Sequence, residues 1–289
     1  FRTLSRLRPR LLLVNGFYPS MLLATLWAVL TRTPLALTID GWAETMPNSP
    51  YHRLIRPLIL SACRFVIVPG KKGRDYFRSQ GFADSRIVTV PLVPAWDAPA
   101  TATPCTERRF DLLWCGHLNH DAKNVGFLVE LCRRLKPLRP NLTLRIIGDG
   151  PARDETLAAL RALGIDPVYD AAKRWDEMSG VFSASRLLVF PSVWEPWGLV
   201  CNEALQCGTP VLVSPHVGAG DDLVRTGETG YVLPLDADQW AATAQRLIFC
   251  GHTHVPALFH SIGGRPAEHF RPLANKPVLV LADEPTGNL

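Results

Sequence analysis

Two glutamates in the second half of the chain have the type and spacing of carboxylates that bind a sugar. Glu195 and Glu203 lie eight residues apart, on the two sides of a junction between a loop and a predicted helix. An ionised carboxylate only accepts hydrogen bonds, so each can accept them from the hydroxyl groups of a sugar. One carboxylate before the helix and one a turn inside it would flank a ligand at the helix N-terminus.

The residues between these glutamates favour an anion at that N-terminus. Pro196 suits the entry to a helix, and Gly198 lets the backbone approach a ligand closely. The N–H groups of Gly198, Leu199 and Val200 would be unpaired in the first turn, where an anionic phosphate binds well. A diphosphate flanked by two hydroxyl-binding carboxylates describes a nucleotide-sugar, which is the ligand we predict.

Alternating strands and helices must position these residues. Short apolar runs predict strands at 11–14, 35–39, 65–69, 87–91, 110–116, 142–151 (which ends in a Gly-Asp-Gly-Pro turn), 186–192 and 209–214. Apolar residues at helical spacing predict helices at 21–30, 51–62, 72–80, 125–135, 152–163, 199–206 and 238–247. This alternation predicts doubly wound α/β domains with parallel sheets, whose ligands bind at the carboxyl ends of the strands.

We expect three parts in the chain. A partial N-terminal Rossmann-like domain with its linker covers residues 1–107, and a nucleotide-sugar-binding domain covers 108–248. An atypical tail covers 249–289. The Pro- and Ala-rich stretch 93–107 separates the first two parts. The first part lacks the opening strand–helix units of a full domain, so we expect it to be truncated.

Composition excludes several classes of protein. Hydrophobic residues make up 47% of the chain and charged residues 20%, which excludes a disordered or collagen-like protein. The formal net charge is +5, but five arginines precede the first acidic residue, Asp40, and the basic and acidic residues that follow balance. A general nucleic-acid-binding surface is therefore not expected. Seven scattered cysteines without a Cys-x-x-Cys pair are typical of reduced thiols in a cytosolic protein.

The apolar stretch Leu11–Leu30 admits two interpretations. Its length raises the question of a membrane span or a signal anchor with an arginine-rich flank. Asn15, Gly16 and Pro19 interrupt it early, however. We favour a short buried strand, a turn and an apolar helix.

The ordered segments of the second half resemble glycosyltransferase family 4. PSVWEPWGLVCNEALQCGTPVL resembles the E-x7-E fingerprint of that family, whose members are retaining enzymes of the GT-B fold. LLWCGHLNHDAKNVGFL resembles the first strand and basic loop of its C-terminal domain, and IIGDGP the end of the next strand. GETGYVLPLDADQWAATAQRLI follows in family order. The resemblance covers about residues 110–248, with a weaker match over 10–92, and implies a GT-B-like fold of two Rossmann-like domains.

The resemblance implies a role for each matched position. Glu203 would hold the ribose hydroxyls of the nucleotide, and Glu195 would contact the donor sugar. The amides from Gly198 to Val200 would bind the phosphates of the donor. Lys123 matches the lysine that neutralises the diphosphate leaving group, an electrostatic contribution of several kcal/mol (about 3 or more) in such sites.

Two positions depart from the family pattern. The family's arginine beside this lysine falls at His117, after Gly116, and a neutral imidazole carries less charge. The family's N-terminal-domain histidine falls near Asp40, which could bind a hydroxyl of the sugar or acceptor. Asp40 also precedes Gly41, so a turn-capping role is an alternative. For His117, a structural role and a role in the site are both compatible with the sequence.

Three other patterns contain residue types that occur in metal or phosphate sites. Asp236 and Asp238 form an Asp-x-Asp pair, but they precede a helix, where Asp is a common N-cap, and metal binding is not expected. In the tail, His252 and His254 resemble part of a metallophosphoesterase motif, and Asp283 and Glu284 resemble an ABC-ATPase Walker B segment. Neither motif has its partner motifs in the chain. The tail is therefore expected to be a strand-and-loop appendage or mobile, and the chain to be a fragment or chimera.

The predicted function is transfer of a sugar from a UDP- or GDP-linked donor to a hydroxyl acceptor with retention. The predicted acceptor is a glycolipid or polysaccharide precursor. No cofactor or metal is expected, because Lys123 and the helix amides take the charge. The predicted location is the cytoplasm, with peripheral docking of the apolar helix at the inner face of the membrane. The alternatives are an inactive or truncated nucleotide-sugar-binding module, and a phosphohydrolase or ATPase fragment built on the tail.

Overall fold

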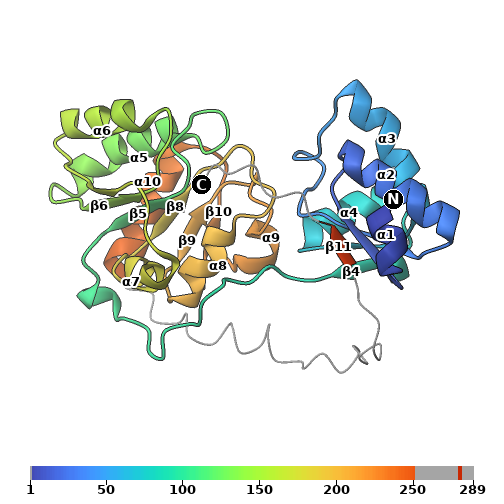
Figure 1. Ribbon diagram of the computed structural model, residues 1–289. Coiled ribbons are helices and arrows are strands. Elements are labelled where there is room, and N and C mark those ends of the chain that lie inside the picture. The colour runs from blue at the N-terminus through green and yellow to red at the C-terminus, as the bar shows by residue number, and fades with distance from the viewer. Residues whose placement is uncertain (1, 251–278, 282–289) are drawn as a thin grey trace. The chain divides into compact units, whose positions relative to one another are not determined.

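The chain folds into two α/β units, each with its own parallel sheet (Figure 1). The computed structural model describes residues 2–250 and 279–281. The first unit contains residues 2–91 and the strand 279–281, and the second begins at Leu92. The tail residues His252, His254, Asp283 and Glu284 lie outside the described residues.

The first unit has a five-stranded sheet in the order β11-β1-β2-β3-β4. Its strands are β1 (Leu12–Asn15), β2 (Leu35–Thr38), β3 (Cys63–Val68), β4 (Ile87–Thr89) and β11 (Leu279–Leu281). Its helices are α1 (Arg2–Leu7), α2 (Pro19–Thr31), α3 (Pro50–Ala62) and α4 (Lys71–Ser79), with a short 3-10 turn, η1 (Asp84–Arg86), before β4. All its strand pairs are parallel, including the backbone pairing of β1 with β11.

The second unit has a six-stranded sheet in the order β10-β9-β8-β5-β6-β7. Its strands are β5 (Leu112–Cys115), β6 (Leu144–Ile147), β7 (Val168–Asp170), β8 (Leu188–Phe190), β9 (Val211–Val213) and β10 (Gly230–Val232). Its helices are α5 (Val125–Leu138), α6 (Arg153–Ala162), α7 (Met178–Ser183), α8 (Leu199–Gln206), α9 (Gly220–Leu223) and α10 (Ala237–Cys250). Two 3-10 turns, η2 (Cys105–Glu107) and η3 (Trp175–Glu177), complete it.

Helices cover both faces of the second sheet, which makes it doubly wound. Leu112 and Trp114 of β5 pack into one core with α5, α6 and α10, whereas Leu113 packs into the opposite core with α7, α8 and α9. Successive side chains of a strand point to opposite faces, so one apolar run supplies both cores. The order β8-β5-β6 places the carboxyl ends of β5 and β8 side by side at the edge where ligands of such sheets bind.

The predicted fold class is confirmed, and most predicted elements lie within a few residues of those observed. The sequence reasoning missed α1, α7, α9, β7, β10 and β11, which are too short to show a period. The described residues include no helix that combines the length and the apolar character needed to cross a bilayer. Residues 19–31 form a helix of the first unit, α2, after a short buried strand.

Candidate active site

The loop that carries Lys123 is held by hydrogen bonds of its backbone to the Asn119 side chain and to the loop after β8. The Asn119 side chain accepts hydrogen bonds from the N–H groups of Ala122 (3.1 Å) and Lys123 (2.8 Å). The carbonyl of Ala122 accepts hydrogen bonds from the N–H groups of Val193 (2.8 Å) and Trp194 (3.3 Å). The loop after β5 is therefore attached to the loop after β8, directly before Glu195.

The segment that carries Glu195 is held from its other side by the chain after β9. Glu195 forms a parallel bridge with Val217, and its carbonyl accepts a hydrogen bond from Gly218 N–H (3.1 Å). A Cβ atom on Gly218 would lie 1.9 Å from the carbonyl oxygen of Pro196, so a glycine is required for this approach. The position of Glu195 is thus set by backbone contacts on both sides.

This arrangement brings Lys123 and Glu195 together. The Lys123 ammonium donates to the Glu195 carboxylate as an ion pair, and the two side chains are 20% and 10% exposed. The ammonium also lies 5.2 Å from the centre of the Phe190 ring, within the range of a cation–π contact. The structure therefore places a largely buried cation and carboxylate, 72 residues apart in the sequence, at the carboxyl end of β8.

The N-terminus of α8 begins three residues after Glu195. Gly198 is the N-cap residue with a φ of 95°, and a Cβ atom there would contact Val217 (3.0 Å) and Phe190 (3.1 Å). The first bond of the helix runs from Cys201 N–H to the Gly198 carbonyl (2.9 Å). Within the described part of the chain, the N–H groups of Leu199 and Val200 have no acceptor. Such a helix start attracts an anion.

Glu203 lies one turn inside α8 and is half-buried. It accepts a hydrogen bond from the indole Nε1 of Trp96 (3.3 Å), whose carbonyl accepts one from the Gln206 side chain (2.6 Å). The Trp96 ring also stacks on Phe182. Burial raises the pKa of Glu203, and the indole hydrogen bond opposes this rise. The segment around Trp96 therefore packs within the second unit and completes the surroundings of this carboxylate.

Two cysteines at the site were not predicted. Burial raises the pKa of Cys115, at the end of β5, to about 12, the charge of Glu203 adds to the rise, and the charge of Lys123 opposes it. Burial and the Glu195 carboxylate likewise raise the pKa of Cys201. Both thiols are therefore protonated near neutral pH and are not nucleophiles. Their electrostatic coupling indicates that the two glutamates and the lysine share one region.

Gly116 and His117 begin the loop between β5 and the Asn119 turn. Gly116 has a φ of 151°, and a Cβ atom on Gly148 would lie 1.9 Å from the Gly116 carbonyl oxygen, so the ends of β5 and β6 approach closely. The Nδ1 atom of His117 is buried and has no hydrogen-bond partner among the residues that the structure describes. This histidine thus retains an unused polar atom beside the Lys123 loop.

Two other positions from the sequence analysis, Asp40 and the Asp-x-Asp pair, make no contact with Lys123, Glu195 or Glu203 that the described structure records. Asp40 follows β2 in the first unit, where it is exposed and its carboxylate has no hydrogen-bond partner in the described chain. Asp236 accepts hydrogen bonds from the N–H groups of Asp238 and Gln239 (both 3.0 Å), at the start of α10. The Asp-x-Asp pair therefore contains a helix cap.

The residues that sequence reasoning missed are those that hold the site. Trp96, Asn119 and Gly218 each contact a predicted residue or its neighbour. Asn119 carried a detectable sequence pattern, because an Asn at a strand end commonly forms such a turn. Trp96 and Gly218 carried none, because their partners are distant in the sequence.

Two family models match the chain. "Glycosyl transferases group 1" matches residues 109–249, and "Glycosyl transferase 4-like domain" matches residues 1–92. Among curated relatives, D-inositol 3-phosphate glycosyltransferase of Rhodococcus erythropolis is 36% identical over 119 residues, which are 38% of this chain and 27% of the relative. Glycogen synthase of Mycobacterium tuberculosis is 30% identical over 141 residues, 48% of this chain and 34% of the relative. These matches span about a third of the relatives' length.

Solved structures share the fold at low sequence identity. The lipopolysaccharide outer core galactosyltransferase WaaB aligns with a TM-score of 0.67 and 17% identity, over 86% of this chain and 68% of that one. HepE of Anabaena, in complex with UDP and glucose, aligns with a TM-score of 0.65 and 17% identity, over 82% and 68%. Both family models describe glycosyl transferases, and each of the two units has the parallel sheet of a Rossmann-like domain. The chain belongs to the family 4 type of glycosyltransferases, with a GT-B-like fold.

Proposed function

We propose that this chain binds a nucleoside-diphosphate sugar and, in its whole protein, transfers the sugar to a hydroxyl acceptor with retention. The observation that carries the proposal is the convergence of Lys123, Glu195 and the N-terminus of α8 at the carboxyl edge of the second sheet. A diphosphate requires cations and N–H donors, and a sugar requires hydrogen-bond acceptors. The site offers both, with Lys123 and the N–H groups of Leu199 and Val200 as donors and the carboxylates of Glu195 and Glu203 as acceptors.

The proposed roles follow from the chemistry of each group. Lys123 and the amides of Gly198, Leu199 and Val200 bind the diphosphate and stabilise the charge that develops as it leaves. Glu195 binds hydroxyls of the donor sugar, and Glu203 binds the ribose hydroxyls. The half-buried position of Glu203 beside Trp96 supports this role, because hydroxyl donors would offset the cost of its buried charge.

Gly116, His117 and Asp40 have supporting roles in the proposal. Gly116 leaves room for the donor at the end of β5, and the unpaired Nδ1 of His117 is available to a donor hydroxyl or phosphate. The exposed carboxylate of Asp40 follows a strand of the first sheet at its carboxyl end, where it can accept a hydrogen bond from an acceptor hydroxyl.

We propose front-face displacement for the transfer itself. The bond from the anomeric carbon to the diphosphate oxygen breaks as the acceptor oxygen bonds to the same face of that carbon. The departing phosphate oxygen takes the acceptor proton, so no protein base is required, and because the acceptor attacks from the face that the diphosphate leaves, no protein nucleophile is required. Lys123 balances the second negative charge of the leaving group.

The proposed acceptor is a saccharide on a lipid or a polysaccharide precursor, reached from an anionic membrane surface. Exposed apolar side chains on α2 and α3, including Leu30 and Leu54 (both 70% exposed), support peripheral docking. Vesicles that contain an anionic lipid should bind the chain, and Leu54→Ser should weaken this binding. Equal binding to neutral vesicles, or none to either, would exclude the membrane part of the proposal.

The first test is calorimetric binding of UDP and GDP to the wild type and to Glu203→Gln. One of the two nucleotides should bind, and the variant should lose about 1–3 kcal/mol, the usual cost of removing one partner of a buried hydrogen bond. Glu228→Gln, an exposed glutamate of the same unit, serves as the matched control and should leave binding unchanged. Absence of binding by every nucleotide would reject the proposal.

The second test separates binding from transfer. In Glu195→Gln, Lys123 loses its carboxylate partner, so the free nucleoside diphosphate should bind at least as tightly as in the wild type. Turnover of a donor sugar should fall about 100-fold or more, because the carboxylate no longer positions the sugar. An unchanged turnover number would remove Glu195 from the proposed chemistry.

A further inference from the structure

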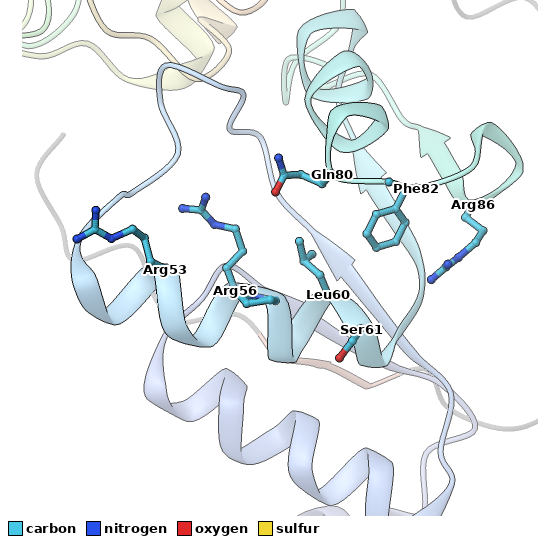
Figure 2. A pocket seen from close by; sticks show the side chains of 9 residues that line it. Arg53, Arg56, Leu60, Ser61, Gln80, Phe82 and Arg86 are labelled. Carbon is cyan, nitrogen blue, oxygen red and sulfur yellow. The ribbon is translucent and has the colours of Figure 1, made fainter.

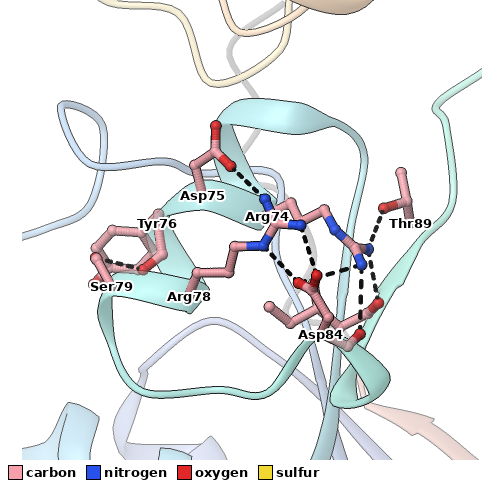
Figure 3. Close-up of polar contacts among 8 residues, drawn as sticks. Arg74, Asp75, Tyr76, Arg78, Ser79, Asp84 and Thr89 are labelled. Carbon is pink, nitrogen blue, oxygen red and sulfur yellow. Dashed lines mark hydrogen bonds and ion pairs between the residues drawn. The ribbon is translucent and has the colours of Figure 1, made fainter.

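The first unit has a net positive charge that exceeds the net charge of the whole chain. Residues 1–91 contain 13 lysines and arginines but only 4 aspartates and glutamates, whereas the whole chain has a net charge of +5. Part of this excess is neutralised on α4. Arg78 pairs with Asp84 (2.5 Å) and Asp75 (3.0 Å), and Arg74 lies 3.4 Å from Asp84 (Figure 3). The carboxylates of this region are thus already engaged.

A second group of arginines lines a cavity of about 510 Å³ between α3 and the connection from α4 to β4. Figure 2 shows Arg53 and Arg56 on α3 on one side, with Gln80, Phe82 and Arg86 on the other. Arg53, Arg56 and Arg86 form no ion pair with any carboxylate that the structure describes. We call this cavity, with these three arginines, the arginine pocket.

Neutral groups hold two of these guanidinium groups in place. Arg56 donates to the Tyr76 hydroxyl (3.0 Å) and to the carbonyl of Pro47, while its Nε is buried and has no partner among residues 2–250. Arg86 donates to the carbonyls of Arg64 (2.9 Å) and Cys63 (2.5 Å). Neutral acceptors orient a guanidinium but leave its charge uncompensated, so both groups are fixed for an anion.

The floor of the pocket is apolar. Leu60 and Phe82 are buried and line the cavity together with Pro57, and the Arg86 guanidinium lies 4.6 Å from the centre of the Phe82 ring. A bound anion could therefore carry an apolar or stacking part next to its charged group.

The arginine pocket contains none of the residues to which the proposed transfer assigns a role. Leu60 and Ser61 are near the end of α3, which leads into β3, and Gln80, Phe82 and Arg86 precede β4, so this side of the pocket lies toward the amino ends of β3 and β4. Arg53 and Arg56 extend the pocket along the first half of α3. We therefore treat the arginine pocket as a site of its own in the first unit.

We propose that the arginine pocket binds a phosphate group carried by an organic molecule. Guanidinium groups match phosphate oxygens with two parallel hydrogen bonds, and three of them can offset a phosphate monoester or diester. The cavity has room for the phosphate and an attached moiety over Leu60 and Phe82. A soluble phosphorylated compound and the headgroup of an anionic lipid share this chemistry.

The test uses the whole chain with two probes, glycerol 3-phosphate in solution and phosphatidylcholine vesicles with or without phosphatidic acid. Arg53→Gln should weaken binding about tenfold, the usual effect of one charge-assisted hydrogen bond, and should not unfold the chain because Arg53 is exposed. Arg10→Gln, an exposed arginine of the same unit outside the pocket, is the matched control. It should change binding less than twofold, or about 0.4 kcal/mol.

A second variant tests the pocket without removing an arginine. Gln80→Glu is isosteric and exposed, and its carboxylate would pair with the arginines and compete with the phosphate. It should abolish the binding of glycerol 3-phosphate, weaken the binding of phosphatidic acid vesicles and leave UDP or GDP binding unchanged. Saturable binding of glycerol 3-phosphate would identify a soluble ligand. Binding of phosphatidic acid vesicles alone, weakened by both Arg53→Gln and Gln80→Glu, would identify a lipid headgroup. Equal effects of Arg53→Gln and Arg10→Gln, or binding of neither probe, would overturn the proposal.

Discussion

The buried carboxylate of Asp111 provides a quantitative test of the packing of the second unit. Its side chain is 0% exposed and accepts hydrogen bonds from Arg139 (2.6 and 2.7 Å), Arg186 (2.6 Å) and the N–H of Thr143 (3.0 Å). Asp111→Asn removes the charge and turns one acceptor into a donor. Removing one partner of a buried ion pair costs about 3–5 kcal/mol, and because both arginines are about one-fifth exposed we expect about 3 kcal/mol.

The loss should depend on pH in a defined direction. Burial acts to raise the pKa of Asp111, but the hydrogen bonds from Arg139, Thr143 and Arg186 outweigh it, so the pKa is lowered in the folded state. The stabilisation is therefore complete above the unfolded pKa of about 3.9 and is lost as the pH falls through the lower folded value. The difference between wild type and variant should be largest near neutral pH and shrink in acid.

Urea unfolding at about pH 7 and about pH 3 measures this difference. Tryptophan fluorescence is a suitable probe, because most of the eight tryptophans of the chain lie in the second unit. Asp166→Asn is the control, since Asp166 forms an exposed pair with Arg161 (3.2 Å) and should contribute less than about 0.5 kcal/mol. A loss below about 1 kcal/mol for Asp111→Asn, or the same loss at both pH values, would refute the argument.

Two further predictions concern the candidate site. Gly218→Ala should push the segment around residue 218 away from the Pro196 carbonyl and weaken nucleotide binding at least tenfold (about 1.4 kcal/mol). Gly180→Ala, which has open space around its Cβ, is the control and should bind the nucleotide as the wild type does in the same calorimetric assay. Trp96→Phe removes the hydrogen bond that opposes the raised pKa of Glu203, so this pKa should rise further. Carboxyl carbon NMR titration measures the pKa, and an unchanged value would contradict the Trp96–Glu203 hydrogen bond.

The sequence predicted what depends on local pattern. Helix α8 has the predicted bounds, because glycines with positive φ lie directly at its start (Gly198) and just after its end (Gly208). Helix α3 begins one residue before its predicted start, since the Ser49 hydroxyl caps it and Pro50 follows. Such contacts lie within a few residues, so a single sequence contains both partners.

The contacts that position the site could not be predicted in this way. The Lys123–Glu195 pair, the Glu203–Trp96 hydrogen bond and the Ala122–Val193 contact each join segments that are far apart in the chain. Their formation depends on the strand order β8-β5-β6, which no periodicity reveals. The residue types were therefore predictable, but their mutual pairing was not.

The pairing has a consequence for how the proposed site would work. Within the chain, Lys123 and Glu195 balance each other's charge, but neither loop depends on that pair, because the Ala122 carbonyl and the Glu195–Val217 bridge hold them. A diphosphate could therefore take the lysine without loosening the loops, and the released carboxylate would face the sugar that arrives with it. The exchange gives Lys123 a new anion, whereas Glu195 loses its cation, so the sugar hydroxyls must donate to the released carboxylate to offset the several kcal/mol (about 3 or more) that an unpaired buried charge costs.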